Sequence, residues 1–164
     1  MREDMAYSFL VEAERGLSQG IEIQKKGWYD LAVQILQLAG EKAIKAFAIL
    51  TGAPERNIQT HVTEKVLDEV PKKHRCKHWN ELKALAPRLD RWIHEDWTNP
   101  CITHVEVGYA GSLFPRRPLH EVIEDSHVAE LQDVVSRINR LVSENTTLFR
   151  KRYEKDRLSN SGRT

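Results

Sequence analysis

The stretch DLAVQILQLAGEKAIKAFAIL, residues 30–50, is the most apolar part of a chain in which 30% of the residues are charged. Its apolar residues recur at spacings of three and four, which is typical of an α-helix. They form two lines along that helix, the first with Ala32, Leu36, Ala39, Ala43, Phe47 and Leu50, the second with Leu31, Ile35 and Leu38. A helix that is apolar over most of its circumference is expected at the centre of a domain, with neighbours on several sides.

The same helix carries a polar line, defined by Gln34, Gln37, Glu41 and Lys45. One interpretation is the solvent-facing edge of the helix, where Glu41 and Lys45 form an ion pair that contributes about 0.2–0.5 kcal/mol. The other interpretation is the lining of a groove, in which Lys42 and Lys45 offer positive charge to a phosphate group. The spacing is compatible with both interpretations.

Length and composition predict a single domain. The chain has 164 residues and a net charge of +1, which argues against a protein that coats nucleic acid through general positive charge. Two cysteines, Cys76 and Cys101, provide no disulfide framework, and no apolar run is long enough to predict a membrane span, so we expect a cytoplasmic protein. We expect the domain over residues 1–158 and a disordered tail over residues 159–164.

Hydrophobic periodicity predicts an all-α chain, because no strand-like alternation occurs. The expected helices span residues 2–26, 30–52, 60–70, 79–93 and 125–153. Gly27 favours the left-handed conformation that ends a helix, and Asp30 is expected to cap the next one. Because only about three residues connect these two helices, we expect them to pack as an antiparallel pair. Pro87 is expected to interrupt the helix over residues 79–93.

A second candidate site is the segment Arg56-Asn57-Ile58-Gln59-Thr60-His61. Histidine has a suitable intrinsic pKa to act as base or acid on a 2′-hydroxyl group, and arginine stabilises charge on a phosphorane. The structural alternative is that Thr60 caps the helix over residues 60–70 and His61 packs in its first turn. His74, Cys76 and His78 match no common zinc-binding spacing, so no metal site is expected.

Residues 98–118 are expected to form a long loop, because three prolines and two glycines interrupt any helical pattern. Loops of about twenty residues inside a compact domain are usually functional or mobile. This loop carries Tyr109, Arg116 and Arg117, which offer a stacking surface and two cations. We therefore expect it to share a groove with the polar line.

Three motifs in the first fifty residues resemble the opening helix pair of the HEPN family. They are Ala13-Glu14-Arg15, then Gly27-Trp28-Tyr29-Asp30-Leu31-Ala32, and then Gln37, Glu41, Lys42, Ala43, Lys45 and Ala46. Thr60-His61 is similar to a Thr-His pair that precedes a short apolar helix in the family. Ser112-Leu113-Phe114-Pro115 falls where the family often has Ser-Arg-Tyr-Pro, and Leu113 departs from it.

The resemblance implies an up-and-down bundle of four to five helices that dimerises. Our leading expectation is a non-catalytic domain that binds a nucleotide or a nucleotidyltransferase partner and needs no cofactor. Its expected ligand contacts are Gln37, Glu41, Lys42, Lys45, Tyr109, Arg116 and Arg117.

Two alternatives remain open. One is a metal-independent RNase of the toxin type, with His61 as acid or base, Arg56 stabilising the phosphate and Asn57 orienting the reacting groups. The other is a structural module whose role is dimerisation.

Overall fold

The computed structural model describes residues 2–94 and 123–161 of the chain. These residues form five α-helices and two short 3-10 helices, with no strand among them. The α-helices are α1 (Arg2–Lys25), α2 (Tyr29–Leu50), α3 (Thr63–Asp68), α4 (Trp79–His94) and α6 (Asp125–Ser161), and the 3-10 helices are η1 (Glu55–Ile58) and η2 (Lys72–His74). The prediction of a helical chain is therefore confirmed for the described residues, whereas the predicted loop over residues 98–118 lies entirely within 95–122, outside them.

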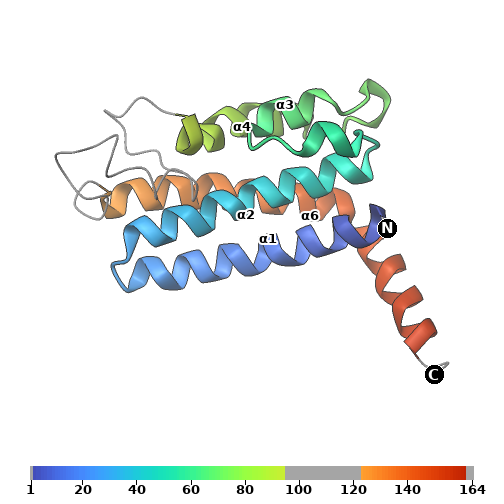
Figure 1. Ribbon diagram of the computed structural model, residues 1–164, viewed down its shortest axis with the longest axis horizontal. Coiled ribbons are helices and arrows are strands. Elements are labelled where there is room, and N and C mark those ends of the chain that lie inside the picture. Colours follow the sequence, from blue (N-terminus) through green and yellow to red (C-terminus); the bar gives the residue numbers. More distant parts are fainter. Residues whose placement is uncertain (1, 95–122, 162–164) are drawn as a thin grey trace.

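Helix α2 is the centre of the arrangement, as its apolar circumference predicts. It contacts α1, α3, α4 and α6, and Figure 1 shows it between α1 and the α3–α4 pair. Helices α1 and α2 run antiparallel side by side, because Gly27, at a φ of 76°, turns the chain between them. None of the helices in residues 2–94 and 123–161 is long and apolar enough to cross a membrane.

Small residues set the distance between α2 and its neighbours. A Cβ atom added at Gly20 of α1 would lie 2.6 Å from Cγ of Leu36, and one added at Gly40 would lie 2.8 Å from Cδ2 of Leu89 on α4. Real side chains do not approach so closely, so both helices depend on glycine at these positions. Leu36 and Leu89 are fully buried as a result.

Helix α3 begins later than its periodicity predicts, because a side chain from another helix caps it. Asp90 of α4 accepts hydrogen bonds from the backbone N–H groups of Thr63 and Glu64, at 2.8 and 2.9 Å, and from the Thr63 hydroxyl at 2.8 Å. The predicted cap, Thr60, instead accepts a hydrogen bond from the Val62 N–H at 3.1 Å. His61 therefore lies before α3 and not in its first turn.

Two other local predictions are wrong. Trp28, not Asp30, is the N-cap of α2, and it caps without a side-chain hydrogen bond. Pro87 lies inside a continuous α4 and does not interrupt it. The side chain of Pro87 is exposed, and burial of Leu85, Ala86 and Leu89 around it offsets the backbone hydrogen bond that proline cannot donate.

Helix α6 is longer than predicted and extends to Ser161, into the residues expected to be a disordered tail. Its C-terminal part projects beyond the other helices near the start of α1 (Figure 1). There Arg150 pairs with Glu14, and Tyr153 stacks on Tyr7 with ring centroids 4.6 Å apart. Beyond the predicted end at residue 153, Glu154 accepts a hydrogen bond from the Tyr7 hydroxyl at 3.2 Å, and Arg157 lies 5.9 Å from the centre of the Tyr7 ring, so contacts with α1 continue into the additional turns.

We expect Gly20→Ala to lower the free energy of unfolding. Overpacking a close-packed core lowers the free energy of unfolding by about 1–3 kcal/mol. The better helix propensity of alanine offsets only about 0.5–1 kcal/mol of this loss. Urea unfolding followed by circular dichroism measures the difference. Ser18→Ala, an exposed change on the same helix, serves as the control and is expected to stay within about 0.5 kcal/mol of the parent. Equal stability of the two variants would contradict the close contact between α1 and α2.

Candidate functional site

The polar line of α2 does not face solvent. Gln37, Glu41 and Lys45 are 1%, 4% and 8% exposed, and Gln34, at the start of the line, is half-buried. The solvent-facing interpretation of this line is therefore wrong. The reason is tertiary, because α2 has helices α1, α3, α4 and α6 as neighbours and His61, from the segment before α3, lies against Glu41.

The Glu41 carboxylate is the centre of a polar group that we call the Glu41 cluster, made of Gln37, Glu41, Lys45 and His61. Lys45 Nζ donates to Glu41 Oε1 at 2.7 Å, and Gln37 Nε2 donates to Oε2 at 3.3 Å. His61 Nδ1 lies 3.0 Å from Oε2 and 3.2 Å from Oε1. Spacings of four residues place the first three on one line of α2, whereas His61 reaches the carboxylate from the segment before α3.

The carboxylate and ammonium of this cluster stabilise each other away from water. Burying a lone charge costs several kcal/mol, and removing one member of a buried pair leaves that cost uncompensated. The pair Glu22–Lys25 on α1 has the same 2.7 Å separation, but its side chains are 65% and 66% exposed. Exposed pairs contribute at most about 1 kcal/mol to stability. Comparing the two pairs therefore shows how burial changes the dependence of stability on an ion pair.

Gln37 has a buried acceptor that is not satisfied. Its Oε1 atom accepts no hydrogen bond from any described residue, although its Nε2 atom donates to Glu41. A buried polar atom without a partner costs about 1–3 kcal/mol, and such atoms are uncommon in folded proteins. Gln37 thus carries an unused acceptor next to a carboxylate, an ammonium and an imidazole.

His61 connects the Glu41 cluster to the surface. Its side chain is 46% exposed, while the Glu41 side chain behind it is 5% exposed. The chain on both sides of His61 is fixed, by Thr60 through the Val62 N–H and by Asp90 through Thr63. A ligand approaching from solvent therefore meets the cluster at the imidazole.

The structure does not group the three predicted catalytic residues. Asn57 donates to Glu69 Oε2 at 2.7 Å, and Arg56 is exposed on η1, whereas His61 turns to Glu41. The acidic partner of His61 is a residue of the predicted ligand site. Sequence spacing could not show this, because Glu41 and His61 are 20 residues apart on different elements.

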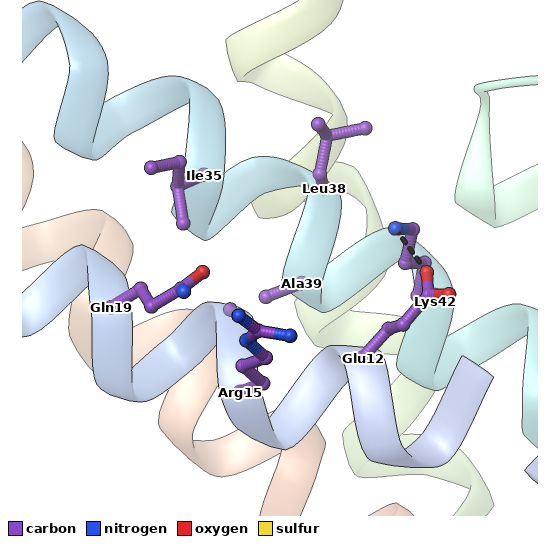
Figure 2. Close-up of a pocket in the computed structure, with 8 residues that line it drawn as sticks. Glu12, Arg15, Gln19, Ile35, Leu38, Ala39 and Lys42 are labelled. Atoms are coloured by element: carbon purple, nitrogen blue, oxygen red, sulfur yellow. Dashed lines mark hydrogen bonds and ion pairs between the residues drawn. The ribbon is translucent and has the colours of Figure 1, made fainter. Parts of the chain in front are cut away.

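Lys42 and Lys45 do not converge on a common anion site. Lys42 forms an ion pair with Glu12 of α1, at the end of a groove between α1 and α2 with a volume of about 350 Å³ (Figure 2). The hydrogen bond from Lys42 lowers the pKa of the Glu12 carboxyl below its usual value, against the opposing effect of burial. The prediction that Lys42 and Lys45 share one phosphate is therefore wrong.

Several residues that matter here were not found from the sequence. Arg15 and Gln19 line the groove beside Lys42, and Asp90 fixes the segment that carries His61. Local spacing gives no signal for Asp90, since it acts 27 residues away from Thr63. The remaining predicted contacts, Tyr109, Arg116 and Arg117, lie outside the described residues.

Within the part of the chain that the structure describes, no three His, Cys, Asp or Glu side chains come together to hold a metal ion. Comparisons with protein-family models, with curated proteins and with solved structures find no match to this chain.

We expect Glu41→Ala to lower the free energy of unfolding by about 3–5 kcal/mol, because it leaves the Lys45 ammonium buried without its partner. Glu22→Ala, at the exposed pair of equal separation, is expected to change it by less than about 0.5 kcal/mol. Denaturant unfolding of both variants makes the comparison.

The double variant Glu41→Leu with Lys45→Met removes both buried charges, and we expect it to recover most of the loss. If Glu41→Ala were as mild as Glu22→Ala, the burial of the Glu41–Lys45 pair would be refuted.

Proposed function

We propose that this chain is a HEPN-like helical domain, built as an up-and-down bundle, that binds a nucleotide at the Glu41 cluster. The observation that carries the proposal is the buried, unsatisfied Oε1 of Gln37 beside the Glu41 carboxylate. The resemblance of the motifs around Gln37, Glu41 and Lys45 to the HEPN family supports the same assignment.

The chemistry of the Glu41 cluster suits a nucleotide. Gln37 Oε1 is an acceptor that needs a donor, such as the exocyclic amine of a base. Lys45 has donors beyond the one it gives to Glu41, and the half-exposed imidazole of His61 offers a ring nitrogen to a ligand at the surface. A ligand that enters past His61 could satisfy Gln37, so that binding removes a cost present in the folded protein.

This proposal assigns the polar residues of α2 different roles. Gln37 would read the ligand directly, while Glu41 would hold Lys45 and His61 in position. Lys42, which Glu12 engages on another side of α2, would take no part. Binding of a nucleotidyltransferase partner remains an alternative for the surface around His61.

We expect Gln37→Leu and His61→Ala to weaken nucleotide binding about tenfold or more, which corresponds to about 1.4 kcal/mol. Isothermal titration with ATP, GTP, CTP and UTP in turn provides the measurement. Lys42→Ala is the matched control on the same helix and is expected to bind as the parent does. A loss of binding in Lys42→Ala with none in His61→Ala would move the ligand to the groove between α1 and α2, and no binding by the parent would refute the proposal.

One observation favours a second function, metal-independent RNA cleavage. A buried carboxylate that contacts Nδ1 holds an imidazole in a fixed orientation, as in general acid–base sites. Glu41 and His61 have this arrangement, and the exposed Arg56 is five residues away in the chain. Metal-independent RNA cleavage at this site would need only His61, Glu41 and a cation that binds the phosphate.

If the domain is an RNase, the parent protein cleaves a mixed-sequence RNA in EDTA. His61→Ala abolishes the cleavage and Glu41→Gln slows it about tenfold or more. Arg140→Gln, on the exposed side of α6, is the control and retains full activity. RNA that stays intact with the parent protein excludes this function.

A further inference from the structure

The groove between α1 and α2 changes from charged to apolar along its length. At one end, Glu12 of α1 pairs with Lys42 of α2. From there the wall formed by α2 continues with Leu38 and Ile35, which line the groove and are half-buried. Leu31, one turn further along the same line of α2, is 38% exposed. The groove therefore has a polar end, beyond which its apolar wall leads out to the surface.

Arg15 lies beside the middle of this groove, and its N–H donors are unused. The next residue, Gly16, faces Ala39, since a Cβ atom added at Gly16 would lie 3.0 Å from Cβ of Ala39. Figure 2 shows Arg15 extending from α1 toward α2, between Glu12 and Gln19. Arg15 forms no hydrogen bond or ion pair with any residue in 2–94 or 123–161.

Every other lysine or arginine of α1 and α2 has a partner among the described residues. These partners are the Ile49 carbonyl for Arg2, Glu22 for Lys25, Glu12 for Lys42 and Glu41 for Lys45. A guanidinium has five N–H donors in a fixed fork that matches the two oxygens of a carboxylate. Arg15 is thus the cation of this helix pair that is available to a ligand.

The charge of the groove favours a ligand with a single negative charge. Two cations, Arg15 and Lys42, and one carboxylate, Glu12, line it, so their net charge is +1. The hydrogen bond from Lys42 lowers the pKa of the Glu12 carboxyl, which keeps this carboxyl ionised at neutral pH. A phosphate monoester carries about 1.5–2 negative charges at pH 7, and Glu12 repels the additional charge.

We propose that this groove binds a carboxylate that carries an unbranched apolar chain. The carboxylate accepts two hydrogen bonds from the Arg15 guanidinium. The Glu12–Lys42 pair occupies the groove on one side of Arg15, so the chain of the ligand extends in the other direction, past Ile35 and toward Leu31. Because these apolar residues follow one line of α2, a single unbranched chain has the shape that covers them.

The size of the groove suits a chain of medium length. Its volume of about 350 Å³ is in the lower part of the range for small-molecule sites. Eleven residues separate Leu31 from Lys42 on α2, which corresponds to about 16 Å along the helix. Octanoate has both a head group for Arg15 and a chain for this wall, and it serves as the probe.

This inference goes beyond the proposed function, because the groove is on a different side of α2 from the Glu41 cluster. Gln37 and Glu41 point to His61, whereas Leu38 and Lys42 line the groove with α1. The two sites also differ in the ligand that they favour, a nucleotide in one and a monoanion with an apolar chain in the other. Either proposal can therefore fail while the other stands.

NMR titration of the isotope-labelled protein with hexanoate, octanoate and decanoate provides the first test. Complete burial of one methylene group corresponds to about a fourfold gain in affinity. Since the groove buries part of the chain, we expect each lengthening by two methylene groups to tighten binding about threefold to tenfold. The amide signals of Gly16 and Ala39 are expected to shift with each acid. Octylamine and octyl phosphate, with the same chain, are expected to bind more weakly than octanoate.

Arg15→Gln removes the charge, and we expect it to weaken octanoate binding about tenfold or more, which corresponds to about 1.4 kcal/mol. An unchanged midpoint of thermal unfolding would show that this loss is not a loss of folding. Arg140→Gln, at a 63% exposed side chain of α6, is the control and is expected to bind octanoate as the parent does. His61→Ala is also expected to retain octanoate binding, which separates this site from the Glu41 cluster.

Three results would overturn the proposal. The first is a parent protein that binds none of the three acids at about 10 mM, a concentration beyond the range of even weak specific binding. The second is octanoate binding of equal strength in Arg15→Gln and the parent. The third is tighter binding of octyl phosphate than of octanoate, because it would contradict the preference for a single negative charge.

Discussion

A helix with neighbours on several sides cannot leave a charge unpaired at its centre, and this constraint governs the arrangement around α2. Helix α2 contacts α1, α3, α4 and α6, and Glu41 on it is only 4% exposed. The carboxylate there is stable only because Lys45, Gln37 and His61 direct donors or a ring nitrogen at it. The packing of four helices thus converts an ordinary helical ion pair into a site whose members depend on each other.

The position of His61 follows from the same packing. It belongs to the segment before α3, and Asp90 of α4 fixes the start of α3 through three hydrogen bonds. A buried carboxylate at a helix N-terminus satisfies N–H groups that the helix itself cannot. The imidazole therefore reaches Glu41 because α4 holds α3, so three elements besides α2 contribute to one polar cluster.

The sequence predicted the long helices better than the site. Periodicity located α1 and α2 to within two residues at each end, since both helices bury continuous apolar faces. The polar line was also identified correctly, but its spacing left a solvent-facing edge and a groove both open, because the burial of Glu41 depends on tertiary contacts such as that with His61. Lys42 was grouped with Lys45, although Glu12, 30 residues earlier in the chain, determines its position. The start of α3 was missed for the same kind of reason, a contact with the distant Asp90.

The backbone of helix α6 is continuous, but the two halves of the helix are stabilised by different kinds of contact. Its first half buries a row of side chains in the core, from Val128 to Val142, whereas Leu148 and Leu158 in its second half are 84% and 75% exposed. The second half is held to α1 chiefly by charged and aromatic groups at the surface, among them Arg150 with Glu14 and Tyr153 with Tyr7. Dissolved salt weakens the ion pairs among these contacts and leaves the aromatic stacking and the apolar burial intact. Ionic strength therefore acts on one end of a single helix, which can open locally while the core remains folded.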